Sequence, residues 1–376
     1  MKVQGQHYRS IWYDEPSGEV RIVDQTLLPH SFVVASLNNV GEVCTAIKTM
    51  QVRGAPLIGA AAAYGLAVAL RDDPTPRSEE KAAKALLATR PTAVNLRWAL
   101  RRVREEIARS PLEDRAARAL EAAKRICDED VETCSQIGEH GFSILERLWS
   151  SRQEEKLRLN VLTHCNTGWL ATVDWGTALS AVYKAHEARI PLHVWVDETR
   201  PRSQGASLTT WELKEHGIDH TLISDNTAGH LMQRGKVDLC LVGSDRTTAH
   251  GDVCNKIGTY MLALAARDND VPFYVALPSS SIDWEITDGL VEIPIEERDP
   301  DEVTEIRGVT AENKVIKVGI APPGTLAANF AFDVTPANLV TALITEEGIF
   351  AASPEGLTKL LTILENREAP ERSING

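Results

Sequence analysis

Long apolar runs are missing from this chain of 376 residues. A membrane-spanning helix needs roughly eighteen consecutive apolar residues, and a secretory signal needs an apolar core near its start. The chain has no such run, and it begins with the polar sequence MKVQGQHYRSIWYDEPSGEV. We therefore expect no membrane span, no targeting segment and a cytoplasmic location.

Cysteine is also scarce, and its spacing does not suit metal binding. The six cysteines are Cys44, Cys127, Cys134, Cys165, Cys240 and Cys254. They form no C-x-x-C pair, and no Cys/His group has zinc-finger or H-E-x-x-H spacing. This pattern predicts reduced thiols and no bound metal.

Two common nucleotide-binding motifs are absent. The sequence contains neither G-x-G-x-x-G, typical of dinucleotide sites, nor G-x-x-x-x-G-K-[ST], typical of nucleoside triphosphate sites. Positive charge is in deficit, since 40 Lys and Arg against 53 Asp and Glu give a net charge of −13. Such a balance does not indicate a nucleic-acid surface. We expect no cofactor, no nucleic acid, and a small molecule as the partner.

Length and composition predict two domains. A chain of 376 residues exceeds the size that one core usually supports. Within residues 1–150, apolar and polar residues alternate over Ser10–Leu28 around a Pro16–Gly18 turn, which predicts a hairpin. Ser36–Trp149 is rich in Ala, Leu, Arg and Glu, which favours consecutive helices. The first domain is therefore predicted to be mainly helical with a small β element.

Residues 151–376 show a different pattern, in which short apolar runs alternate with helical segments. The runs that predict strands are Val161–Thr163, Leu192–Val196, Thr221–Ile223, Leu239–Val242 and Phe273–Ala276. This alternation is typical of a doubly wound parallel sheet. The predicted fold class is α/β, with the helical domain followed by a Rossmann-like domain and a boundary near Ser150–Lys156.

Polar residues directly follow two of these strands. Cys165 comes after the first strand, in THCNTG, ahead of a predicted helix over Leu170–Ala188. Asp245 comes after the fourth, in a predicted loop over Gly243–Asp252 that leads to a predicted helix over Lys256–Arg267. Open parallel sheets bind ligands at the carboxyl ends of their strands. A lone Cys is often a core residue and an Asp after a strand is often a turn residue, but together they predict an active site.

A phosphate site is predicted at the start of an earlier helix. Arg53, Gly54 and Ala55 lead into the Ala-rich segment Pro56–Ala69, whose proline suits a first helical turn. Exposed N–H groups and the helix dipole favour an anion there, and an arginine can bind phosphate through two hydrogen bonds. A surface arginine beside an ordinary helix cap is the alternative.

Further polar residues lie in predicted loops. Arg90 precedes Pro91, which disfavours a helical conformation at Arg90, and the nearby rival Arg97 is expected to face solvent. Gln204 follows the second strand in DETRPRSQGA, and Asn255–Lys256 follows the fourth. Each has an alternative role in a turn or a helix start, but the lysine could neutralise the charge of a substrate.

Several motifs together resemble a known family. They are MQVRGAPLIG, RPTAVNL, LTHCNTG, DETRPRSQGA, GSDRTTAHGD and NKIGTY, in a match that runs from Ile11 to Gly348. The chain resembles the family that unites methylthioribose-1-phosphate isomerases with the alpha, beta and delta regulatory subunits of the eukaryotic guanine-nucleotide exchange factor for translation initiation. The resemblance implies catalysis by Cys165 and Asp245, and substrate binding by Arg53, Gly54, Ala55, Arg90, Gln204, Asn255 and Lys256.

The resemblance also implies a reaction in methionine salvage, carried out by a homodimer. The aldose 5-methylthioribose 1-phosphate becomes the ketose 5-methylthioribulose 1-phosphate. Asp245 would protonate the ring oxygen, as a carboxyl kept protonated in a closed, largely apolar pocket. Cys165 would remove the proton from C2 as a thiolate or, if hydride shifts directly from C2 to C1, polarise the substrate. His164 is expected to be structural, because neighbours on a strand point to opposite faces.

Other interpretations stay open. A 5-deoxyribose 1-phosphate is an alternative substrate, because apolar contacts to the 5-substituent discriminate weakly. A regulatory subunit would share the fold without turnover, and a ribose 1,5-bisphosphate isomerase would need cations for a second phosphate. Four residues, His250, Phe330, Trp169 and Trp175, depart from the family pattern near the expected pocket, which leaves the identity of the substrate open.

Overall fold

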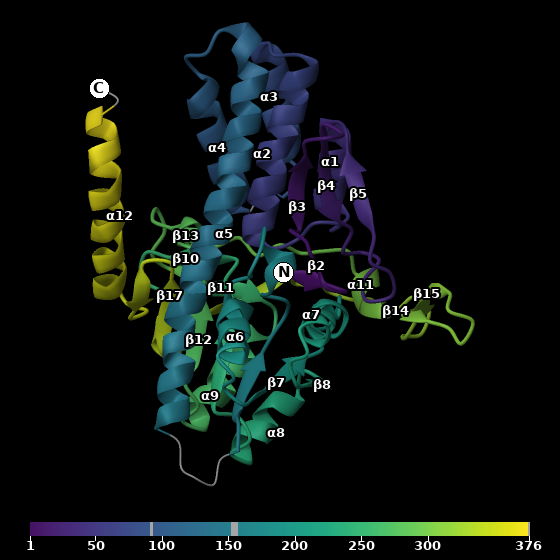
Figure 1. Cartoon of the computed structure of the whole chain (residues 1–376). Coiled ribbons are helices and arrows are strands. Elements are labelled where there is room, and N and C mark those ends of the chain that lie inside the picture. Colours follow the sequence, from purple (N-terminus) through teal and green to yellow (C-terminus); the bar gives the residue numbers. More distant parts are fainter. Residues whose placement is uncertain (91–92, 152–156, 375–376) are drawn as a thin grey trace.

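The computed structural model describes residues 1–90, 93–151 and 157–374. A column of helices, formed by the first part of the chain, stands on a layered part with a central sheet (Figure 1). The predicted fold class is confirmed, since a mainly helical part with a small β element precedes a part built on a largely parallel sheet. The division at residue 150 stays a prediction, because residues 152–156 of the expected boundary lie outside the described residues.

The small β element is larger than predicted. The hairpin of β3 (Ile11–Asp14) and β4 (Glu19–Val23) forms as expected, and β5 (Val34–Leu37) pairs with β4 as a third strand. Two short strands, β1 (Lys2–Val3) and β2 (Gln6–His7), form a separate pair. Strand β3 contacts α2, so this element packs against the helices.

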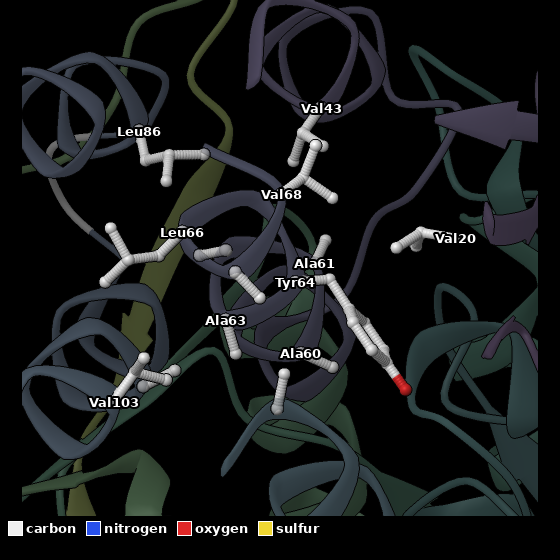
Figure 2. Close-up of a cluster of buried hydrophobic side chains, with 14 of the residues drawn as sticks. Val20, Val43, Ala60, Ala61, Ala63, Tyr64, Leu66, Val68, Leu86 and Val103 are labelled. Carbon is white, nitrogen blue, oxygen red and sulfur yellow. The ribbon is translucent and has the colours of Figure 1, made fainter. Parts of the chain in front are cut away.

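The predicted consecutive helices are α1 (Val40–Lys48), α2 (Ala55–Asp72), α3 (Pro76–Leu87), α4 (Val94–Ile107) and α5 (Leu112–Ser150). Helix α2 lies at their centre and is buried over nearly its whole length. Figure 2 shows Ala60, Ala61 and Ala63 of α2 among larger side chains, such as Leu86 and Val103, that neighbouring helices supply. Each fully buried large aliphatic side chain stabilises the fold by about 1.5–3 kcal/mol. This packing fixes the position of α2 and therefore of its first turn.

The central sheet has seven strands in the order β18-β17-β12-β9-β6-β7-β8. They are β6 (Leu159–Thr163), β7 (Leu192–Asp197), β8 (His220–Ile223), β9 (Leu239–Val242), β12 (Phe273–Ala276), β17 (Ala342–Thr345) and β18 (Gly348–Phe350). The five predicted strands all form and are parallel, and β17 and the antiparallel edge strand β18 extend the sheet beyond the prediction.

The strand order of this sheet reverses between β6 and β9. Strands β7 and β8 continue on one side, and β12 and β17 continue on the other. In open α/β sheets, ligands bind at such a switch point, outside the carboxyl ends of the strands. Cys165 and Asp245 follow the two strands that flank it.

The helices between these strands are α6 (Ala178–Glu187), α7 (Thr210–Glu215), α8 (Thr227–Gln233) and α9 (Thr259–Asp268). The helix predicted over Leu170–Ala188 is wrong in its first half. Only a short 3₁₀ turn, Trp169–Ala171, forms there, and the α-helix begins at Ala178. Trp175 and Gly176 have φ of 66° and 85°, which a right-handed helix cannot contain.

A second sheet has the order β13-β10-β11-β16. Its strands are β10 (Arg246–Thr248), β11 (Val253–Lys256), β13 (Ile282–Asp283) and β16 (Phe332–Thr335). The loop predicted over Gly243–Asp252 therefore contains a strand, and the helix predicted from Lys256 begins only at Thr259, after Gly258 with φ of 104°. The pairing that forms this sheet is distant in sequence, with Asn255 opposite Asp333, so the local pattern could not show it.

The remaining elements lie at the edges of the molecule. They are the hairpin β14 (Glu305–Val309) and β15 (Val315–Gly319), the short helices α10 (Gly289–Glu292) and α11 (Asp301–Thr304), and the long helix α12 (Pro354–Ile374). Figure 1 shows the hairpin projecting from the body and α12 standing apart from the helical column. Within residues 1–90, 93–151 and 157–374, no helix has the length and apolar character that a membrane crossing requires.

Candidate active site

The turn after β6 holds Cys165 in an uncommon backbone conformation. Its φ is 64°, in the left-handed region that non-glycine residues rarely adopt. Its N–H donates to Oγ1 of Thr199 at 2.8 Å, and its carbonyl accepts from Oγ1 of Thr209 at 2.7 Å. Its Sγ lies 3.7 Å from Oε1 of Gln204. These contacts fix the buried thiol at the carboxyl end of the sheet and bring the predicted Gln204 to it.

The predicted phosphate loop meets this turn. Nη1 and Nη2 of Arg53 donate to Oδ1 and to the carbonyl O of Asn166 at 2.5 and 3.0 Å. Gly54 has φ of 98°, and a Cβ at this position would lie 2.3 Å from the carbonyl oxygen of Ala171, so only glycine fits. Ala55 begins α2 without a side-chain cap, which leaves backbone N–H groups of the first turn for an anion.

Glu212 holds Asn166 in place, a role that the sequence analysis missed. Its buried carboxylate accepts from Nδ2 of Asn166 at 2.9 Å, from the N–H groups of Trp169 and Leu170 at 3.0 and 3.1 Å, and from the hydroxyl of Tyr183 at 2.5 Å. Burial raises the pKa of Glu212, and these donors oppose the rise. A glutamate in the helical sequence WELKEHG is usually exposed, so no local signal indicated this role.

Asp245 and Lys256 form an acid and a cation within one site. The N–H of Asp245 donates to the carbonyl of Cys254 at 3.0 Å, which holds the start of β10 beside β11. Burial raises the pKa of the Asp245 carboxyl, and the positive charges of Lys256, Arg53 and Arg90 oppose the rise. Burial also lowers the pKa of the Lys256 ammonium. A carboxyl with a raised pKa is suited to proton donation.

Arg90 links the helical part to the sheet part. Its Nη2 and Nε lie 3.0 and 3.1 Å from Oε2 of Glu296. Its positive charge also opposes the rise in the pKa of Asp245. Pro91, on which the prediction for Arg90 rested, lies outside the described residues. The rival Arg97 is exposed, as expected.

Asn255 supports the site from β11. It is 4% exposed, and its Nδ2 donates to Oγ1 of Thr259 at 3.0 Å, which ties the strand to the start of α9. The structure thus brings the predicted residues to the carboxyl end of the central sheet and the adjoining start of α2. These residues are Cys165, Asp245, Arg53, Gly54, Ala55, Arg90, Gln204, Asn255 and Lys256.

Three potential metal ligands gather nearby. Among the described residues, His164, Asp197 and Asp225 place their donor atoms within 4.8 Å of one another. The oxygens of Asp225 already accept the N–H groups of Thr199 and Arg200 at 2.6 and 2.8 Å, and both nitrogens of His164 are hydrogen-bonded. A metal would have to displace these bonds, so this group does not fit an open metal site. The expectation of no bound metal stays a prediction.

The four residues that depart from the family pattern lie at packed or exposed positions. Trp169 is fully buried and packs against another tryptophan at a ring distance of 6.2 Å. Trp175 lies under a lysine ammonium at 4.4 Å. Phe330 is 52% exposed, and His250 is exposed.

Comparison with known proteins identifies the family. Residues 51–352 match the Initiation factor 2 subunit family. The chain belongs to this family. A protein from Rhodospirillum rubrum named methylthioribose-1-phosphate isomerase is 58% identical over 363 residues, covering 96% of this chain and 93% of that protein. One from Rhodospirillum centenum with the same name is 56% identical over 375 residues, covering 100% of both chains.

Solved structures of the Initiation factor 2 subunit family share the fold. The 5-methylthioribose 1-phosphate isomerase from Pyrococcus horikoshii has a TM-score of 0.81 and 40% identity, covering 96% of this chain and 100% of its own. A structure titled as the translation initiation factor eIF-2B, subunit delta, from A. fulgidus has a TM-score of 0.75 and 40% identity, covering 94% of this chain and 100% of its own. The family predicted from the motifs is confirmed.

Proposed function

We propose that this chain converts 5-methylthioribose 1-phosphate into 5-methylthioribulose 1-phosphate, the aldose-to-ketose step of methionine salvage. One observation carries this proposal. Cys165 and Asp245 follow the two strands at the switch point of the sheet, and Arg53 at the start of α2 is bonded to the Cys165 turn. Relatives named for this activity at 56% and 58% identity support the choice of substrate.

The substrate phosphate binds at the start of α2. The backbone N–H groups of Gly54 and Ala55 and the guanidinium of Arg53 surround it, as at other helix N-termini that bind anions. Lys256 and Arg90 add positive charge, which acts on Asp245 together with that of Arg53. Gln204 and Asn255 remain to bind the sugar hydroxyls, which orients C2 toward the thiol.

Asp245 acts as the acid and Cys165 as the base. The Asp245 carboxyl, whose pKa burial raises, gives its proton to the ring oxygen as the bond from C1 to that oxygen breaks. The thiolate of Cys165 takes the proton from C2, and the electron pair of that bond forms a C1–C2 double bond. Return of the proton to C1 and loss of the C2 hydroxyl proton to Asp245 produce the ketone. In the rival mechanism, hydride shifts from C2 to C1 and Cys165 polarises the substrate.

A regulatory subunit without turnover is the second candidate. The A. fulgidus structure titled as an initiation factor subunit, with a TM-score of 0.75, favours it. The thiol and an acid whose pKa is raised in one site favour the enzyme, because an acid with a shifted pKa beside a nucleophile is typical of catalytic sites. A third candidate, an isomerase of a 5-deoxypentose 1-phosphate, differs only in the 5-substituent.

One assay separates these candidates. The purified full chain is incubated with 5-methylthioribose 1-phosphate and with 5-deoxyribose 1-phosphate, without added metal or nucleotide, and the sugars are followed by NMR. Ketose formation is expected, and the two rates rank the 5-substituents. No turnover of either sugar would refute the isomerase.

We also propose that the protein is a cytoplasmic homodimer. All six cysteines are free, which suits a reducing compartment. On α9, Tyr260, Met261 and Leu264 are 38%, 67% and 42% exposed, and this apolar surface is a candidate for cover by a second copy. A mass of one protomer by light scattering would contradict the dimer.

A further inference from the structure

His164 is buried with both ring nitrogens facing hydrogen-bond acceptors. It is 2% exposed, and its Nδ1 lies 2.9 Å from Oδ2 of Asp197. Its Nε2 lies 2.8 Å from the carbonyl oxygen of Ile257. A carbonyl and an ionised carboxylate can only accept hydrogen bonds, so each ring nitrogen must carry a proton. With Asp197 ionised, this geometry requires an imidazolium.

The charges around the ring agree with this geometry. Burial by itself lowers the pKa of His164, but the hydrogen bond and charge of Asp197, with Asp225 beyond it, produce a net rise. Burial raises the pKa of Asp197, and the hydrogen bond and charge of His164 oppose that rise, so the two groups stabilise each other as an ion pair. Asp333 on β16 adds a third negative charge, and Lys256, which directly precedes Ile257, is a cation close to the ring.

We propose that His164 is a positioning residue for the isomerisation, an inference that rests on the proposed function. Its imidazolium joins three segments that each carry a site residue. The first is its own turn, in which Cys165 follows directly. The second is the end of β7, whose following loop holds Gln204 against the thiol. The third is the turn at Ile257, which directly follows Lys256.

The imidazole ring of His164 is tightly packed against Gly258. A Cβ on Gly258 would lie 2.9 Å from Cε1 of His164, and Gly258 has φ of 104°. The N–H of Gly258 donates to Oδ2 of Asp333 at 2.7 Å, so the turn after Lys256 is held from both sides. Loss of either imidazolium bond would let Cys165 and Lys256 move apart. A misplacement of about 1 Å at a reacting group costs about 100-fold in rate.

The substitution His164→Gln has a matched control in His193→Gln. His193 is also buried, at 4% exposure, and lies on β7 with a single bond, from Nε2 to Oγ1 of Thr221 at 2.9 Å. We expect His164→Gln to lower kcat by about 10-fold to 100-fold with KM within about 3-fold of wild type. His193→Gln should keep the wild-type kcat even if it lowers Tm. An unchanged kcat in His164→Gln overturns the proposal.

Asp197→Asn and Asp197→Leu together separate positioning from a packing defect. The amide of Asp197→Asn can accept from a protonated Nδ1 or, turned over, donate to an unprotonated Nδ1, so His164 keeps both of its bonds. Asp197→Leu, which has a similar volume, leaves Nδ1 without this partner. We expect Asp197→Leu to lower kcat by about 10-fold to 100-fold and Asp197→Asn to retain most of the wild-type kcat. A kcat that is equally low in both variants overturns the proposal.

NMR of the full chain with ¹⁵N-labelled histidine tests the imidazolium without any turnover. The His164 signals are assigned by their loss in His164→Gln. Two protonated nitrogens are expected at neutral pH, because both ring nitrogens face acceptors. A neutral ring at neutral pH overturns the proposal. A doubly protonated ring in a chain that turns over neither sugar phosphate would refute the isomerase and leave the connection of the three segments in place.

Discussion

The guanidinium of Arg53 donates a 2.5 Å hydrogen bond to Oδ1 of Asn166, although 113 positions separate the two residues. Asn166 directly follows Cys165, so the predicted phosphate loop and the predicted catalytic thiol are parts of one bonded unit. The unit ends at Glu212, which binds the other end of the Asn166 side chain at 2.9 Å. The orientation of Arg53, the proposed phosphate ligand, therefore depends on the Glu212 carboxylate through the side chain of Asn166.

Glu212→Gln should weaken phosphate binding. The amide presents an N–H₂ group where the carboxylate accepts four donors, so Asn166 loses its support and Arg53 its orientation. A hydrogen bond to a charged group contributes about 1.5–3 kcal/mol, which corresponds to a rise in KM of roughly 10-fold to 100-fold. The KM from steady-state kinetics and the Kd of inorganic phosphate measure this weakening of phosphate binding. Tyr183→Phe, which removes one donor and keeps the carboxylate, is the control and should change KM much less; equal effects would argue against this role.

Cys165→Ser and Asp245→Asn should each abolish most of the turnover. General acid or base catalysis contributes about 10²-fold to 10⁴-fold per group, so kcat should fall by about 100-fold or more. Binding of the product should stay measurable, because neither change removes the phosphate site. Cys44→Ser, at a half-buried thiol in α1, is the control. Near-normal turnover in either site variant would exclude that residue from the mechanism.

Gly54→Ala should disrupt the phosphate loop through sterics. The new Cβ would lie 2.3 Å from the carbonyl oxygen of Ala171, and the backbone has φ of 98°. The control is Gly217→Ala, where φ is 67° but nothing lies within 4 Å of the new Cβ, so only the left-handed conformation costs about 1–2 kcal/mol. We expect Gly54→Ala to lower Tm further than Gly217→Ala and to lose phosphate binding. Calorimetry with and without phosphate measures both the Tm and phosphate binding. Equal Tm values in the two variants, with phosphate binding intact in Gly54→Ala, would contradict the proposed role of Gly54 in the phosphate loop.

The local sequence pattern predicted those features that depend on neighbouring residues. The five parallel strands form because each is a short apolar run that polar or turn residues follow, and the same pattern led to Cys165 and Asp245. The second sheet was missed because β11 pairs with β16 across a distant stretch of chain, with Asn255 opposite Asp333. Glu212 was missed because only tertiary packing buries it. Charged residues whose role depends on such packing have no signal in a single sequence.

Asp130, on α5, should make stability decrease as the pH rises from about 4 to about 7. Burial raises the pKa of its carboxyl to about 7, while the N–H of Val173, which donates to Oδ2 at 2.7 Å, opposes the rise. Between the ordinary carboxyl pKa of about 4 and the raised value, the folded chain keeps a proton that the unfolded chain has lost, so stability falls with rising pH and levels off above about 7.

The variant Asp130→Asn tests this prediction, because its amide can accept the same N–H without ionising. Its Tm should therefore be close to wild type at about pH 4 and higher than wild type at about pH 8. Asp128→Asn, at a 65% exposed carboxyl on the same helix, is the control for the loss of one negative charge. A difference between Asp130→Asn and wild type that is the same at both pH values would show that Asp130 does not titrate in this window.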